Sequence, residues 1–192
     1  AGEVSVDDLM EVYYINFKKN VGTEKANKLD DLLQKYMQPG MSVTDAKKSL
    51  LADLQYKANV LHDCRTLSAD GNLVRCFCWD VSGDIEKLTA NTASMVTAIL
   101  GNFEIAEQMG YLHDKGLTEI MQAIVNRFIH GQKPEFFNNE LKGVSEIVWN
   151  EFDVDRNCVL HIQKDAILMM EDAFSANVCE LEKLILEKKN NP

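Results

Sequence analysis

Five cysteines carry the most varied chemistry in the sequence: Cys64, Cys76, Cys78, Cys158 and Cys179. Thiols form disulfides in oxidising compartments, and elsewhere they serve mainly as small apolar core residues. The chain also starts at Ala1 with neither an initiator Met nor a charged and apolar leader, which is typical of a mature secreted chain. We therefore expect a secreted, extracellular protein with two disulfides and one free thiol, or five core thiols if the protein is cytoplasmic.

Zinc is a second use for these thiols, because His62 precedes Cys64, and Cys76 and Cys78 follow after a turn-rich stretch. Imidazole and thiolate are zinc ligands, but paired ligands in zinc sites are usually separated by two to four residues. Here one residue separates the members of each pair, which strains a tetrahedral shell. The spacing therefore favours a disulfide that closes the turn, or reduced core thiols, over zinc.

Asp153, Asp155 and Asn157 place oxygen ligands at alternate positions, and Leu160 follows them. In this pattern residues 144–174 resemble a degenerate EF-hand, with the three polar residues at the first, third and fifth loop positions. The resemblance implies that a loop between two helices binds calcium through these residues. A divergent calcium-binding protein is therefore one candidate function, and calcium is the one cofactor that the sequence suggests.

The loop departs from the EF-hand family at two positions that matter for calcium. Cys158 replaces the glycine that makes the sharp turn, and Lys164 replaces the glutamate that binds the ion with two oxygens. A lysine ammonium repels a cation. The sequence therefore favours a connector between two helices whose turn is capped by Asp153 or Asp155.

Enzyme chemistry has weaker support in the sequence. Nucleophilic catalysis needs a Ser or Cys beside a His and an orienting group, and the isolated histidines form no such motif: His62, His113, His130 and His161. Paired acids such as Asp7-Asp8 and Asp30-Asp31 are typical of the first turn or polar face of a helix. The sequence contains no glycine-rich phosphate loop. We therefore expect a protein that is not an enzyme.

The elements that position these residues are predicted from the spacing of apolar side chains. Apolar residues recur every three and four positions, which is typical of amphipathic helices. Helices are predicted over residues 6–19, 23–37, 42–62, 82–103, 117–129, 134–152 and 165–188, with Ser5, Thr23 and Ser42 as N-caps. Only the turn-rich segment near 64–81 is irregular. We therefore expect an all-α single domain over residues 1–192, a bundle or array of about seven to eight helices.

The charge balance limits the classes of partner. Thirty acidic and 20 basic residues give a net charge of −10. Nucleic acids and anionic membranes bind clusters of Lys and Arg, so we expect neither as a partner. No apolar run approaches the roughly 20 residues of a membrane span. An acidic surface steers basic proteins, so we expect the chain to act by binding a protein partner.

A carrier of a small hydrophobic ligand is a competing function. Eight Met and eight Phe stand among many aliphatic residues, and helices rich in these side chains can enclose an apolar cavity. The residues expected to line such a cavity are Met95, Ile99, Phe103, Met121, Val125 and Phe128. The same apolar stripes also form solid cores, which is the more usual outcome.

Overall fold

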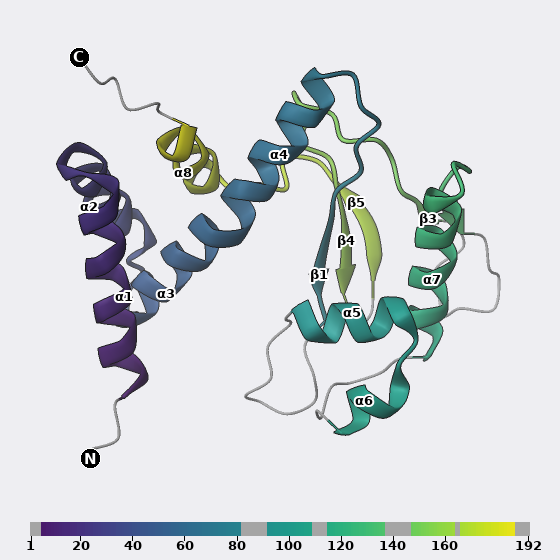
Figure 1. Cartoon of the computed structure of the whole chain (residues 1–192), viewed down its shortest axis with the longest axis horizontal. Coiled ribbons are helices and arrows are strands. Elements are labelled where there is room, and N and C mark those ends of the chain that lie inside the picture. Colours follow the sequence, from purple (N-terminus) through teal and green to yellow (C-terminus); the bar gives the residue numbers. More distant parts are fainter. Residues whose placement is uncertain (1–4, 82–91, 109–114, 137–146, 164–165, 187–192) are drawn as a thin grey trace. The chain divides into compact units, whose positions relative to one another are not determined.

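The computed structural model describes residues 5–81, 92–108, 115–136, 147–163 and 166–186 (Figure 1). The chain divides into two compact units: unit 1 contains Ala1–Thr66 and Phe174–Pro192, and unit 2 contains Leu67–Ala173. The expectation of a single domain over residues 1–192 stays a prediction. In the described part of the chain, every helix is too short or too polar to cross a lipid bilayer.

Unit 1 is built from helices. They are α1 (Val6–Val21), α2 (Thr23–Tyr36), α3 (Val43–Ala52), the π-helical turn η1 (Asp53–Lys57), the first turns of α4 (Ala58–Ala69), and α8 (Ala176–Leu186). Helix α1 packs against α2 and α3, and α8 packs against η1 and α2. The N-caps predicted at Ser5 and Ser42 are confirmed, because their hydroxyls accept hydrogen bonds from the N–H groups of Asp8 and Asp45, both at 3.1 Å. The N-cap predicted at Thr23 is wrong, because Gly22 occupies that position and Thr23 is the first residue of α2.

Aliphatic side chains fill the interior of unit 1. The most deeply buried large side chains belong to α2, α3, α4 and α8: Leu29, Leu50, Leu61, Val178 and Leu181. Polar contacts also connect α8 to the other helices. Arg65 of α4 forms an ion pair with the buried carboxylate of Glu182, and Lys25 of α2 donates to the carbonyl oxygen of Leu184 at 2.6 Å. The second contact satisfies a carbonyl near the C-terminal end of α8.

The helix predicted over residues 42–62 forms with one widened turn. Segments α3, η1 and α4 follow one another without a break. In η1 the N–H of Ala58 bonds to the carbonyl of Asp53, one residue further back than in an α-helix. The side-chain amide of Asn59 donates to the carbonyl oxygens of Leu54 and Gln55, at 3.0 and 2.9 Å. These bonds stabilise the widened turn, because its carbonyls have lost regular helical partners.

Unit 2 combines helices with two small sheets. One sheet has the order β1-β4-β5, with strands β1 (Phe77–Asp80), β4 (Val159–Gln163) and β5 (Ile167–Met170). Strand β1 is parallel to β4, with Phe77 opposite Leu160, and β4 is antiparallel to β5, with Val159 opposite Met170. The other elements are β2 (Glu135–Phe136), its antiparallel partner β3 (Ile147–Val148), α5 (Thr92–Leu100), α6 (Phe103–Gln108) and α7 (Lys115–Ile129).

One hydrophobic core joins the sheet of unit 2 to α7. Its buried members are Val81, Leu117, Ile120, Met121, Ile124, Ile147, Trp149, Leu160 and Ile162. Phe77 and Trp79 of β1 pack against this cluster. The indole Nε1 of Trp149 donates to the carbonyl oxygen of Cys76 at 2.9 Å, and its ring meets the Phe77 ring edge-on at 5.7 Å between centroids. Trp149 therefore joins the start of β1 to the core by a polar and an apolar contact.

The all-α prediction is wrong, because unit 2 contains strands. The helix predicted over 134–152 includes β2 and β3, and the helix predicted over 165–188 begins as β5 and becomes helical only in α8. The segment near 64–81 is helical as far as Ala69 and becomes strand β1 at Phe77. The predicted bundle of seven to eight amphipathic helices is therefore replaced by a helical unit and an α+β unit.

Short apolar runs explain this error. In β5, Ile167 and Met169 pack against the core, whereas Leu168 and Met170 are partly exposed, at 42% and 36%. This alternation has the period of a strand, but four consecutive apolar residues fit a helix equally well. The parallel pairing of β1 with β4 joins segments that are distant in sequence, so no local pattern indicates it.

The predicted disulfides are also wrong. None of the five cysteines forms a disulfide, and no two of them are at disulfide distance. Cys64, Cys76 and Cys158 are buried, which is the usual place of a thiol that acts as a small apolar side chain. The cysteines therefore no longer support secretion, and the extracellular location stays a prediction.

We expect a thiol count of five. Alkylation of the denatured, unreduced protein should add five labels to each chain, because no cysteine of the structure is in a disulfide. Intact mass spectrometry gives the count, and a reduced sample is the control. A count of one would mean two disulfides and would contradict the arrangement of cysteines described above.

Candidate functional site

The residues predicted to bind calcium lie in the turn that leads into β4. One carboxylate oxygen of Asp153 accepts hydrogen bonds from the N–H groups of Asp155 and Arg156, at 2.9 and 3.1 Å, and the other accepts one from the Nε of Arg156 at 2.9 Å. The N–H and guanidinium of Arg156, together with the N–H of Asp155, lower the pKa of the Asp153 carboxyl below its usual value. Asp153 therefore caps a turn with its own neighbours.

Calcium would have to replace these contacts. The Arg156 guanidinium lies beside Asp153 and also bonds to Glu171 at 3.0 Å. Asn157, the third predicted ligand, is buried and has a φ of +47°, in the left-handed region that asparagine tolerates. The loop lies between β3 and β4, so the pair of helices that the EF-hand resemblance implies is not formed.

Potential metal ligands do not form a cluster in the described part of the structure. Across the described ranges, no group of three or more His, Cys, Asp or Glu side chains is placed to hold one metal ion. The zinc candidates His62 and Cys64 belong to α4, while Cys78 belongs to β1. The register does place Cys78 opposite His161 of β4, a pair that the sequence spacing did not suggest.

The residues predicted to line an apolar cavity mostly pack against the core of unit 2. Met121 has no exposed surface, and Ile99 and Val125 pack against the same cluster. Phe128 is partly exposed and stacks on Trp149 at 5.6 Å between ring centroids. Met95 is half-buried on α5, and the side chain of Phe103 lies outside the described part. Met121, Ile99 and Val125 therefore fill space in the core.

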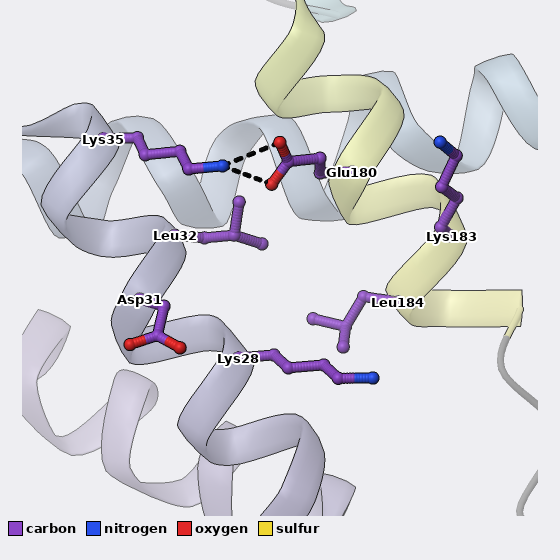
Figure 2. A pocket seen from close by; sticks show the side chains of 7 residues that line it. All are labelled: Lys28, Asp31, Leu32, Lys35, Glu180, Lys183 and Leu184. Atoms are coloured by element: carbon purple, nitrogen blue, oxygen red, sulfur yellow. Dashed lines mark hydrogen bonds and ion pairs between the residues drawn. The ribbon is translucent and has the colours of Figure 1, made fainter.

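A groove of about 350 Å³ separates α2 from α8 in unit 1. Figure 2 shows Leu32 of α2 and Leu184 of α8 directed toward each other across it. Lys35 closes one end by donating to both carboxylate oxygens of Glu180, at 2.7 and 2.6 Å. Lys28, Asp31 and Lys183 complete the rim.

The chemistry of this groove is polar. Leu32 and Leu184 are only 4% and 6% exposed, so little apolar surface is available to a ligand. The rim carries three lysines and two acidic residues in a chain with a net charge of −10. The groove therefore suits a charged segment better than a small hydrophobic molecule.

Helix α1 of unit 1 carries several exposed apolar side chains. The contacts of Tyr14 show which side of this helix faces the interior. The Tyr14 ring is buried, its hydroxyl donates to Asp30 of α2 at 3.0 Å, and the ammonium groups of Lys18 and Lys47 lie over the ring at 5.7 and 5.1 Å from its centroid. Burial, and the hydrogen bond to Asp30, raise the pKa of the Tyr14 phenol above its usual value. The hydroxyl therefore stays protonated and remains a donor.

The opposite side of α1, which we call the outer face, carries large apolar side chains. Leu9, Val12, Tyr13 and Ile15 are 57%, 56%, 44% and 41% exposed. Val12 lies about 200° around the helix axis from Tyr14, because each residue advances about 100°. Ile15 lies at the border of this face, about 100° from Tyr14, and together with Tyr14 it lines a groove of about 450 Å³ that reaches Val43 of α3. The outer face is therefore an apolar surface open to solvent.

Sequence reasoning missed the outer face. The apolar spacing over residues 6–19 predicts one stripe that includes Leu9 and Tyr13, but these two side chains are exposed, and Val12 and Ile15 fall outside the stripe. The available signal was a helix that is apolar on both sides, which requires two covering surfaces.

No protein-family model matches the chain, and no curated protein matches it significantly.

We expect the stabilising effect of Asp153 to depend on pH. Hydrogen bonds hold the pKa of its carboxyl below 3.8 in the folded chain, so the stabilisation is complete above pH 3.8 and is lost as the pH falls further. The difference in Tm between wild type and Asp153→Ala should therefore narrow below pH 3.8. Thermal melts at a series of pH values measure it, with Asp155→Ala as control. A difference that persists unchanged at pH 2 would count against the cap.

We expect Met121→Ala to destabilise unit 2 by about 2–5 kcal/mol, because it leaves a void in a packed core. Both tryptophans, Trp79 and Trp149, belong to unit 2, so urea unfolding followed by tryptophan fluorescence reports on it. Met170→Ala, at an exposed methionine of β5, is the control and should cost less than about 1 kcal/mol. Equal effects of the two changes would indicate that Met121 lines open space.

Proposed function

We propose that the protein is not an enzyme and functions by binding a protein partner through the outer face of α1. The observation that supports this proposal is the exposure of Leu9, Val12, Tyr13 and Ile15 within two turns of one helix. Single exposed apolar residues are common on protein surfaces, but contiguous ones are typical of interaction sites. A partner that covers them gains about 25 cal/mol for each Å² of apolar surface removed from water.

The polar surroundings of the outer face suit a protein interface. Asp7 and Asp8 lie in the first turn of α1, and Lys18 and Lys19 lie in the last. The apolar centre therefore has charged ends, which resembles the polar rim around the core of an interface. The net charge of −10 acts at longer range and steers encounter, while the apolar centre supplies affinity.

The groove between α2 and α8 is the weaker candidate for the same function. Its leucines are almost fully covered, whereas Val12 alone is 56% exposed. Its Lys35–Glu180 ion pair is largely exposed, and exposed pairs contribute little free energy. The apolar surface available for binding is therefore larger on α1.

We expect the double variant Val12→Asp/Ile15→Asp to lose partner binding while it stays folded. Both side chains are exposed, so the change should move Tm by only a few degrees. Capture from an extract with a photo-crosslinker at Asn16, on the same face, compares this variant with wild type. Loss of a captured partner by about tenfold or more is expected, as for central interface residues.

The control is Val96→Asp, which makes the same change at a valine that is 40% exposed on helix α5. A protein counts as a partner only if wild type and the control capture it and the double variant does not. Equal capture by all three would contradict the proposal. So would a collapse of Tm in the double variant, because the outer face would then be covered within the chain.

A further inference from the structure

We propose that the partner on this face is a second copy of the chain, bound with its α1 antiparallel to the first α1 around a two-fold axis. This inference rests on the proposed function, because the second copy covers the same outer face. Its basis is the order of charged and apolar residues along α1.

A line of four residues runs along the outer face: Asp8, Val12, Ile15 and Lys19. Steps of four, three and four residues keep their side chains on one side of a helix, as in the contact line of a helix pair. All four side chains are exposed. The line is therefore acidic at one end, apolar in the middle and basic at the other end.

This line is complementary to its own reverse. When two copies of α1 lie antiparallel and cross between Tyr13 and Tyr14, Asp8 of each copy lies opposite Lys19 of the other, and Val12 lies opposite Ile15. Each contact then occurs twice, as a two-fold interface requires. A parallel pair would instead place Asp8 against Asp8 and Lys19 against Lys19, and like charges in contact are unfavourable.

The ends of α1 favour the same direction. The N-terminal end of a helix carries partial positive charge and the C-terminal end partial negative charge, so antiparallel neighbours bring opposite ends together. Leu9 lies one turn from Val12 and extends the apolar area, whereas Tyr13 lies further around α1, where its hydroxyl accepts a hydrogen bond from the Gln55 side chain. Asp7 and Lys18 point to the other side of α1, where they pair with Lys48 and Asp30 of the same chain.

The dimer is expected to be weak. A helix of 16 residues is about 24 Å long, so one helix pair buries less than the roughly 1,200 Å² of a standard interface. Each copy also carries a net charge of −10, which opposes association at low salt. We therefore expect a dissociation constant on the order of 10–100 μM.

Sedimentation equilibrium of the full chain tests the proposal at about 5 to 500 μM, a range that brackets this constant. The average mass of the wild type should rise from 21.7 kDa toward twice that value as concentration increases. Val12→Asp should stay a monomer throughout. If circular dichroism shows that this variant loses helix, Val12→Ser replaces it, because serine removes the apolar contact without adding a charge.

Charge exchange tests the antiparallel register. Asp8→Lys and Lys19→Asp should each weaken the dimer by about tenfold or more, because each single change creates two like-charge contacts. The two changes combined should restore dimerisation toward the wild-type constant. The matched control is Asp7→Lys, which makes the same charge change in the same turn but on another side of α1, and should change the constant less than about twofold.

A wild-type mass of 21.7 kDa at every concentration would overturn the dimer. A dimer that Val12→Asp or the two charge exchanges leave unchanged would also overturn it. Either result leaves the proposed function standing if the Val12→Asp/Ile15→Asp variant still loses its captured partner, since that partner is then a different protein. The two failures are therefore distinguishable.

Discussion

The buried hydroxyl of Tyr14 determines how α1 is rotated in unit 1. Both sides of this helix are apolar, so hydrophobic burial alone does not select one of them. With the Tyr14 side of α1 turned toward α2, the hydroxyl reaches Asp30 and the carbonyl oxygen of Leu29, which avoids the cost of about 1–3 kcal/mol of a buried hydroxyl without an acceptor. That rotation directs Val12 and Ile15 outward. The apolar outer face thus follows from a polar contact in the interior.

Trp149 has a comparable role in unit 2. It follows β3 in the chain, but its indole contacts Phe77 of β1, Phe128 of α7 and the carbonyl of Cys76. A large aromatic ring packs against several elements, and the hydrogen bond of its N–H group fixes the orientation of the ring. The parallel pair β1 and β4 therefore forms beside a side chain that belongs to neither strand.

The two units differ in whether their candidate functional residues have structural roles. In unit 2, Cys76 and Cys158 are buried, Asp153 caps a turn, and Met121 fills the core, so each satisfies a local structural need. In unit 1, Leu9 and Val12 of α1 are more than half exposed in the described part of the chain. The free energy that their full burial would supply is therefore available to a partner.

Local patterns in the sequence determined the helices of unit 1, because caps at Ser5 and Ser42 and apolar spacing over 23–37 and 42–62 act within a few residues. They also indicated the turn at Asp153, whose carboxylate accepts hydrogen bonds from residues two and three positions further along the chain. The strands were decided by tertiary structure, since a run such as Ile167–Met170 becomes a strand only beside β4. The tertiary structure also decided which side of α1 became the outer face. Which of two apolar sides is buried depends on Asp30 of a neighbouring helix, and a distant hydrogen-bond acceptor leaves no trace in local spacing.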